Sequence, residues 1–309
     1  MSISRKTFLK QFLAGTASAV FAPRILMARP AVYKKLVILH TNDTHARIES
    51  FPKNHPEFGG MGGFAKRAEL VEQVRAQEKN VLLLDAGDVF QGTPYFNLYG
   101  GELDYKLMSK LRYDASTLGN HEFDNGVDGW LKVRKFAEFP ILNSNYKISR
   151  TDAREAVDNL LVKELGGVKV GIFGLGINFK GLILESQHEG FRYFDPVNTA
   201  RGVARNLKQY LDCDFVICLS HLGFEYEGDA VSDKIIAREV PDIDLIIGGH
   251  THTFLDKPFE VYHTDGRITR IVQAGFGGIR LGRIDYQFNP LNEIKAVAQA
   301  QMLVSQKMG

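Results

Sequence analysis

Five short motifs between residues 43 and 252 carry side chains of the kinds that bind transition-metal ions. Carboxylate oxygen, amide oxygen and imidazole nitrogen suit zinc, manganese, iron or cobalt, and no cysteine thiolate takes part. The candidate ligands are two aspartates, one asparagine and four histidines: Asp43, His45, Asp88, Asn120, His221, His250 and His252. One tetrahedral ion needs about four ligands, so this inventory fits two divalent ions that share a bridging carboxylate. Two ions about 3.5–4 Å apart clamp the attacking and leaving oxygens of a phosphoryl transfer.

Taken one at a time, these motifs carry little information. An isolated Asp-x-His pair is usually a surface feature, and a lone histidine after a strand, such as His221, is more often a hydrogen-bonded structural residue. The pair His250 and His252 is stronger, because alternate residues of an extended segment share one side. Only the occurrence of all five motifs in one chain favours a metal site.

Short apolar strands are the elements that must position these motifs. The sequence predicts strands at residues 36–40, 81–85, 115–118, 168–175, 215–220 and 245–248. Several are continuous apolar runs, as is typical of strands buried on both faces. Five of these runs lead into the five motifs. Sites in open α/β sheets form where strands bring their carboxyl ends to one edge, so we expect the motifs to meet there.

Helix-like stretches alternate with these strands, which predicts an α/β fold. Apolar residues recur at helical spacing from Phe64 to Val74, and Asp195 followed by Pro196 is a typical helix start. After residue 255 the pattern changes to strands and turns, with expected strands at residues 259–262, 268–273 and 281–288. This segment predicts a second sheet or an extended sheet edge that closes the domain.

Residues 1–31 differ from the rest of the chain. They hold five basic residues and no acidic one, with a mildly apolar run over residues 12–22. This layout is typical of a secretory signal, and residues 4–10 resemble a twin-arginine signal with Lys6 in place of the second arginine. We therefore expect export to the periplasm or beyond, with a Sec signal or an uncleaved membrane anchor as the alternatives.

Charge, hydropathy and cysteine placement argue against a nucleic-acid-binding protein, a membrane span after residue 31 and a disulfide. Of the 38 Lys and Arg residues, five lie in residues 1–31, so 33 remain against 36 Asp and Glu. The charge runs are short and mixed in sign, which gives no nucleic-acid-binding patch. No apolar stretch long enough to span a membrane follows residue 31. Cys213 and Cys218 would point to opposite faces of one strand, so we expect them to be unpaired.

The five motifs together resemble the catalytic domain of bacterial 5′-nucleotidases, within the calcineurin-like metallophosphoesterases. The matching strings are Ile-Leu-His-Thr-Asn-Asp-Thr-His at 38–45, Gly-Asp-Val-Phe-Gln-Gly-Thr at 87–93, Gly-Asn-His-Glu-Phe-Asp at 119–124, Ser-His at 220–221 and Gly-Gly-His-Thr-His-Thr at 248–253. The resemblance covers about residues 34–288. It implies a four-layer αββα sandwich with the metal site at the strand carboxyl ends, in a catalytic domain over residues 32–309.

The resemblance also implies a role for each matching residue. One ion would be held by Asp43, His45, Asp88 and His252. The other would be held by Asp88, Asn120, His221 and His250, with Asp88 bridging. His121 would face the substrate and Asp124 would orient it, and three residues of separation are short enough for Asp124 to accept a ring N–H and fix the tautomer. Some family members have glutamine where this chain has His252.

Six other residues receive a structural interpretation. We expect Glu122 to orient backbone rather than to bind metal, and His40 to lie in the core or behind the ligands. Asp85 fits a supporting role behind the ligands and a turn role equally well. For Tyr95, Phe96 and Tyr99, packing in the core is a better prediction than lining the site.

The expected activity is hydrolysis of phosphate monoesters, 5′-nucleotides foremost, by an exported two-metal enzyme. A water that bridges two divalent ions has its pKa lowered toward ~7 and can attack phosphorus in line, with His121 and Asp124 assisting. The alternatives are a phosphodiesterase or a sulfur-ester hydrolase with the same two metals, or a non-catalytic metal-binding subunit of a partner nucleotidase. Full-length 5′-nucleotidases usually continue into a second, substrate-gripping domain. We expect that domain to be absent here, so a separate partner could supply it.

Overall fold

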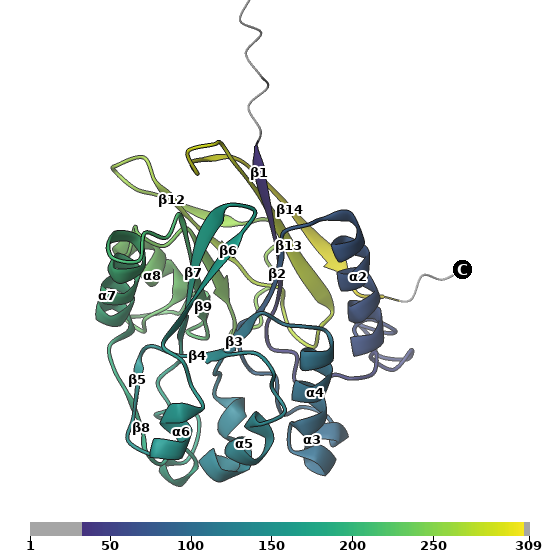
Figure 1. Cartoon of the computed structure of the whole chain (residues 1–309). Coiled ribbons are helices and arrows are strands. Elements are labelled where there is room, and N and C mark those ends of the chain that lie inside the picture. Colours follow the sequence, from purple (N-terminus) through teal and green to yellow (C-terminus); the bar gives the residue numbers. More distant parts are fainter. Residues whose placement is uncertain (1–32, 306–309) are drawn as a thin grey trace, which may run out of the picture. The chain divides into compact units, whose positions relative to one another are not determined.

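The computed structural model describes residues 33–305, so the expected export signal lies outside the described residues. Two six-stranded sheets form the centre of this part (Figure 1). The first sheet has the order β14 (Ile294–Leu303), β13 (Arg280–Phe288), β1 (Lys34–Thr41), β2 (Val81–Asp85), β3 (Ala115–Thr117), β4 (Ile141–Leu142). The second has the order β11 (Phe259–Tyr262), β12 (Ile268–Val272), β10 (Leu245–Gly248), β9 (Phe215–Ser220), β7 (Val168–Leu175), β6 (Leu160–Leu165). Strands β5 (Tyr146–Ile148) and β8 (Phe191–Tyr193) form a separate two-stranded sheet.

Each sheet contains four neighbouring parallel strands, which antiparallel strands extend. β1 to β4 pair in parallel, while β13 and β14 extend that sheet in antiparallel fashion. In the second sheet β7, β9, β10 and β12 are parallel, and β6 and β11 are antiparallel edge strands. The parallel arrangement brings the carboxyl ends of β1, β2, β3, β9 and β10 to one side, where the motifs begin.

Side chains along each strand point alternately to the two faces of its sheet, and those on the inner faces form a core between the two sheets. Leu36 and Ile38 of β1 point inward and meet Phe215 and Ile217 of β9, and all four side chains are fully buried. The Tyr286 ring of β13 packs against the Phe215 ring in the same core, with centroids 4.6 Å apart and planes 59° apart. The neighbouring residues on each strand point outward, where helices cover them.

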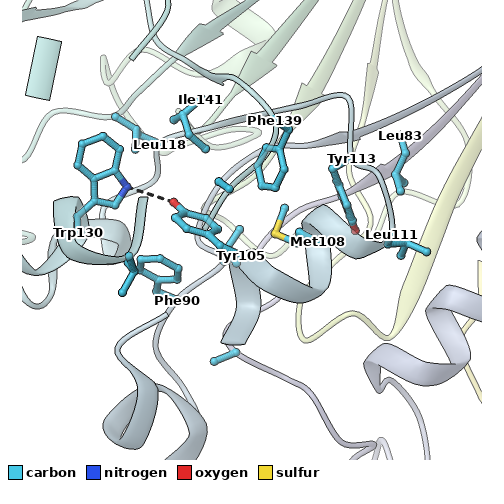
Figure 2. Packing of buried hydrophobic residues seen from close by; sticks show 14 of the residues in the cluster. Leu83, Phe90, Tyr105, Met108, Leu111, Tyr113, Leu118, Trp130, Phe139 and Ile141 are labelled. Carbon is cyan, nitrogen blue, oxygen red and sulfur yellow. Dashed lines mark hydrogen bonds between the residues drawn. The ribbon is translucent and has the colours of Figure 1, made fainter. Parts of the chain in front are cut away.

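Two further cores join helices to the outer faces of the sheets. The outer face of the first sheet packs against α2 (Phe64–Gln77), α4 (Glu102–Lys110) and α5 (Gly126–Arg134). Figure 2 shows this cluster, in which Trp130 Nε1 donates a hydrogen bond of 3.1 Å to Tyr105 Oη. The outer face of the second sheet packs against α7 (Pro196–Gln209) and α8 (Asp233–Glu239). Helix, sheet, sheet and helix layers confirm the predicted four-layer α/β sandwich (Figure 1). The remaining elements are α3 (Pro94–Tyr99), α6 (Thr151–Glu155) and the 3₁₀ turns η1 (His121–Phe123) and η2 (Glu185–Gln187).

Most of the predicted elements are present with nearly the predicted bounds. The strands at 81–85, 168–175, 215–220, 245–248 and 259–262 agree residue for residue. Helix α7 starts as expected, with the Asp195 side chain accepting a hydrogen bond from Asn198 N at 2.7 Å. Cys213 and Cys218 are buried free thiols, as predicted. Among residues 33–305 no helix combines the length and the apolar character needed to cross a bilayer.

The segment after residue 255 differs from the prediction. Rather than forming one new sheet or edge, it divides: β11 and β12 complete the second sheet, whereas β13 joins the first. β14, which pairs with β13, has no counterpart among the predicted strands. This last strand is an edge strand with only partly buried side chains, so its apolar alternation is weak in the sequence.

Candidate metal centre

The loops at the carboxyl ends of the central strands bring the candidate ligands into two groups. The first group is Asp43, His45 and His252, and the second is Asp88, His221 and His250. In each group, one ligand atom per residue lies within 4.8 Å of the others. The predicted asparagine also lies here, with Asn120 Oδ1 3.0 Å from His250 Nδ1. The structure therefore gathers all seven residues selected from the sequence.

The loop after β1 is fastened to the loop after β2 by backbone hydrogen bonds. Asp43 N donates to Gly87 O at 2.9 Å, and His45 N donates to Asp88 O at 3.1 Å. Gly119, after β3, lies against the same loop, because a Cβ at this position would be 2.2 Å from Asp88 Oδ1. A glycine is thus required here for close approach, rather than only for a sharp turn.

The first group places two ring nitrogens face to face. His45 Nε2 lies 3.0 Å from His252 Nε2, and His252 Nε2 lies 3.4 Å from Asp43 Oδ1. His45 Nδ1 lies 3.1 Å from the Phe90 carbonyl oxygen, which can only accept. That contact puts the proton on Nδ1 and leaves the Nε2 lone pair directed into the group, as is usual for a metal-binding histidine.

The second group is more deeply buried. His221 Nδ1 donates to Ala86 O at 2.7 Å, so Nε2 is the ring nitrogen left for an ion, and it lies 3.0 Å from Asp88 Oδ2. His221 Nε2 is buried and has no hydrogen-bond partner among the described residues. The same atom lies 4.0 Å from Asp43 Oδ1, so the two groups adjoin.

The surroundings of these side chains fit divalent cations. Burial disfavours a charged His221 ring, yet the carboxylates of Asp88 and Asp43 outweigh it and raise the pKa of His221 to about 10. In the metal-free site these carboxylates thus favour a proton on Nε2, and a divalent cation at the same place would replace that proton. A buried nitrogen without a partner, two carboxylates and rings oriented by backbone carbonyls are the arrangement that a metal ion would complete.

Five of the seven residues adopt left-handed backbone conformations. The φ angles are 49° at Asp43, 50° at His45, 52° at Asp88, 70° at His250 and 52° at His252. Residues other than glycine rarely adopt such angles, and a strained residue costs on the order of 1–3 kcal/mol. Clustering of this conformation at one site indicates that the loops are shaped for function rather than for stability.

Glu122 holds the central loops together, as predicted. Its carboxylate accepts hydrogen bonds from the backbone N–H groups of Asp88 (3.1 Å), Val89 (2.8 Å) and Gly119 (2.6 Å). Burial and the charge of Asp88 raise the pKa of Glu122 to about 7, although the hydrogen bonds from Gly119 and Val89 oppose the rise. Glu122 therefore fixes the path of the chain on both sides of Asp88.

Two other residues from the sequence analysis also lie behind the ligands. Asp85 accepts hydrogen bonds from Gly87 N (2.9 Å) and from Thr41 Oγ1 (2.6 Å), so it both closes the turn and anchors β1 to β2. Burial raises the pKa of Asp85 to about 6 despite these hydrogen bonds. His40 is a core histidine, fully buried, and burial lowers its pKa to about 3.

His121 and Asp124 form the expected pair, with His121 Nδ1 2.9 Å from Asp124 Oδ2. Burial disfavours the charged ring, but the hydrogen bond with Asp124 and the charge of Asp88 outweigh it and raise the pKa of His121. The His121 ring lies at the edge of the first group, 5.3 Å from the His45 ring between centroids. Gln187 supports the pair by donating to the Asp124 carbonyl oxygen at 2.8 Å.

A pocket of about 280 Å³ opens over the first group. Its walls include three residues that the sequence analysis did not select: Arg47, Gln91 and Phe276. The Phe276 ring stacks on His252 with centroids 5.1 Å apart and planes 15° apart. No motif marks Phe276, and the only sequence signal for Arg47 is its position two residues after His45. Of the three aromatic residues on α3, Phe96 is buried in the core as predicted, Tyr95 is half-buried, and Tyr99 is exposed, so the prediction of core packing is wrong for Tyr99.

Comparison with known proteins identifies relatives over most of the chain. The family model of the calcineurin-like phosphoesterases matches residues 36–254. A snake venom 5′-nucleotidase of Crotalus adamanteus is 38% identical over 82% of this chain and 45% of its own length. The human 5′-nucleotidase is 37% identical over 82% of this chain and 47% of its own length. The chain therefore spans about half the length of these relatives.

Solved structures agree with these matches. A 5′-nucleotidase precursor from Thermus thermophilus is 33% identical, with a TM-score of 0.79 over 88% of this chain and 55% of that chain. A calcineurin-like phosphoesterase, YfkN, from Bacillus subtilis is 25% identical, with a TM-score of 0.68 over 88% of this chain and 92% of that chain.

Proposed function

Because this chain belongs to the calcineurin-like phosphoesterase family, we propose that it is a two-metal hydrolase of phosphate monoesters, with 5′-nucleotides as the preferred class. The observation that carries the proposal is the meeting of Asp43, Asp88 and His221 at the boundary between the two ligand groups. That arrangement supports two adjacent cations, with Asp88 as the bridge. Relatives named 5′-nucleotidase, 38% and 37% identical, support the substrate class.

Each residue of the centre has a distinct task in this proposal. The two ions, when bound, supply an acidified water and neutralise phosphate charge. The first group together with Asp88 would hold one ion, and Asp88, Asn120, His221 and His250 would hold the other. His121 points into the pocket from the edge of the first group and donates a proton or hydrogen bond to the leaving oxygen. Asp124 accepts from Nδ1 and so leaves Nε2 free for the substrate.

The charge of the site favours phosphate esters. Two divalent ions against the carboxylates of Asp43 and Asp88 leave a surplus of about two positive charges, which a phosphate dianion would neutralise. No protein nucleophile is required. The reaction would release an alcohol, a nucleoside in the case of a 5′-nucleotide, together with inorganic phosphate.

Activity measurements on metal-reconstituted protein test the proposal. The protein is loaded with manganese, zinc or cobalt and assayed against nucleoside 5′-monophosphates, p-nitrophenyl phosphate and bis-p-nitrophenyl phosphate. Turnover of the monoesters that vanishes on chelation and returns on metal addition is expected. Absence of monoester turnover with every metal would reject the proposal, and faster turnover of the diester would replace it by phosphodiesterase activity.

Export belongs to the same proposal and rests on residues 1–31 of the sequence. If the twin-arginine route is used, the protein crosses the membrane folded, with its ions in place. Replacing Arg5 and Lys6 by glutamine should then leave folded, active protein in the cytoplasm. Unchanged export of this variant would argue for another route.

A further inference from the structure

One wall of the pocket over the first ligand group carries an unpaired positive charge. Arg47 is half-buried there, and its guanidinium carbon lies 4.0 Å from the centroid of the Phe51 ring. Arg47 Nε is buried and has no hydrogen-bond partner among the described residues. Within residues 33–305, none of the ion pairs involves Arg47, although most other half-buried arginines pair with a carboxylate.

The backbone fixes Arg47 relative to the metal ligands. Arg47 N donates to Thr44 O at 3.0 Å, and Ala46 N donates to Val89 O at 2.7 Å. These hydrogen bonds lie on either side of His45, so the side chain that follows two residues later has a defined starting point. The backbone of Arg47 is therefore part of the hydrogen-bonded loop that carries His45.

The aromatic platform under Arg47 is tied to the same loop. Phe51 is 6% exposed, and its ring packs against Gly277, where a Cβ would approach it to 2.9 Å. Gly277 N donates to Asp43 O at 2.7 Å. Stacking on an aromatic ring orients a guanidinium while its N–H groups stay available at the edge.

The nearest acidic candidate does not neutralise this charge. Glu49 lines a neighbouring pocket with Arg47, but it forms no ion pair with Arg47 among the described residues, and its carboxylate accepts a hydrogen bond from Tyr95 Oη at 2.8 Å. A partly desolvated guanidinium without a carboxylate partner is unfavourable. An oxyanion entering the pocket would supply two oxygens in the geometry that the planar guanidinium prefers.

We propose that Arg47 is an anion-binding residue of the pocket and takes the phosphoryl oxygens of a phosphate ester held at the candidate metal centre. This inference rests on the proposed function and deepens it. Arg47 adds a third positive charge to the surplus of about two that the ions would leave, so it favours the dianion of a monoester over the monoanion of a diester. The product, inorganic phosphate, would use the same contact.

The test compares Arg47→Gln and Arg47→Lys with the unchanged protein, each loaded with manganese. The matched control is Arg201→Gln, because Arg201 lies on α7 outside the pocket. Calorimetry measures the affinity for inorganic phosphate, and kinetics give kcat and KM for p-nitrophenyl phosphate and its bis ester. Arg47→Gln should weaken phosphate binding and raise the monoester KM about 10–100-fold, the usual value of hydrogen bonds to a charged group. The diester KM should change less, and kcat and metal content should stay near those of the control.

Arg47→Lys separates the effect of the positive charge on phosphate binding from the effect of the planar guanidinium. It keeps the positive charge but loses the planar fork, so its phosphate affinity should fall between those of the glutamine variant and the unchanged protein. Phe51→Leu, which removes the platform and keeps the guanidinium, should weaken phosphate binding by a few-fold. This variant also serves as the test if Arg47→Gln does not fold.

Each other outcome has a definite meaning. Full phosphate affinity in metal-loaded Arg47→Gln, or no phosphate binding by the unchanged protein, would overturn the inference. Loss of metal together with phosphate affinity would make Arg47 a structural support of the His45 loop and would also overturn it. If the unchanged protein binds phosphate through Arg47 but hydrolyses no ester, the inference stands and the proposed function fails.

Discussion

The two ligand groups differ in what holds their histidines. In the buried group, the side chain of His221 has no exposed surface and its Nδ1 is fixed by the Ala86 carbonyl. In the open group, the side chain of His252 is 40% exposed, and its contacts are the His45 ring nitrogen, Asp43 and the stacked Phe276 ring. A fully buried hydrogen bond to a backbone carbonyl orients His221, whereas aromatic stacking beside a pocket positions His252; His45 of the open group is also oriented by a backbone carbonyl, that of Phe90.

This difference suggests a division of work between the two groups. A preorganised, water-excluded group should bind its ion more tightly and exchange it more slowly. An open group beside His121 and Arg47 is better placed to meet substrate and to tolerate different ions. Asp88 belongs to the buried group and, as the proposed bridge, would couple the two.

The largest effect is expected from replacing Asp88, the proposed bridge between the two ligand groups. Without its charge, both groups should bind their ions weakly, and the difference in metal affinity between them should disappear. Asp88→Asn keeps the size of the side chain but takes away the negative charge between the groups. Each ion contributes several kcal/mol to the reaction, and 1.36 kcal/mol is a factor of ten, so activity should fall by about a thousandfold or more. Metal analysis after dialysis should show that both ions bind more weakly. Loss of one ion alone would show that Asp88 is not shared.

A change in the His121 and Asp124 pair should lower turnover without loss of metal. Asp124→Asn removes the carboxylate that holds His121 and raises its pKa. Turnover should fall about 100-fold, within the range for general acid catalysis, while both ions remain bound. In the unchanged protein, Asp124 raises the pKa of His121 and keeps its ring protonated to higher pH. The variant loses this effect, so the pKa of His121 falls and the alkaline limb of its pH–rate profile should move to lower pH. An unchanged profile would show that His121 does not act through its proton.

Glu122 tests the rigidity of the buried group. Glu122→Gln replaces one accepting oxygen by an NH₂ group, so at least one backbone N–H around Asp88 loses its partner and faces another donor. Metal affinity should fall about 10–100-fold, as for other residues that orient ligands. Titration of metal-free protein with manganese, with exposed Glu155→Gln as the control, measures this change. Equal affinities in the two variants would show that the loops hold their shape without the Glu122 carboxylate.

The sequence predicts the buried parts of this molecule better than its loops. Strands such as Phe215–Ser220 and Val168–Leu175 agree with their predicted bounds because continuous apolar runs have a clear physical reason to be buried. The motifs also predict which side chains meet, since parallel strands share one edge. β14 was missed because a half-exposed edge strand needs little apolar surface.

The features around the ligands were beyond sequence reasoning for a different reason. The left-handed backbone at Asp43 and His250 depends on loops from distant strands that hold it in place, and no local preference predicts it. Arg47 and Phe276 enter the pocket from loops whose course is set by contacts with the Asp43 loop. A residue that acts through such tertiary contacts leaves no spacing pattern to find.

The smallest loss of activity is expected from a change in the open group. His252→Gln tests most directly whether the open group binds its ion independently of the buried group. Glutamine also offers a neutral donor atom, and the 40% exposed position can accept the change without a buried cavity. Activity should fall by about tenfold or less, with the preferred metal shifting toward ions that favour oxygen ligands, such as manganese over zinc. Metal titrations that resolve two binding steps should show a weaker second step and an unchanged first one. A weakened first step would mean that the two groups bind their ions as one rigid unit, because a change confined to the exposed ring would then have reached the buried histidines.

Phe276→Leu removes the ring stacked on His252 but keeps His252 itself. It should weaken the second metal-binding step too, by a smaller factor than His252→Gln does.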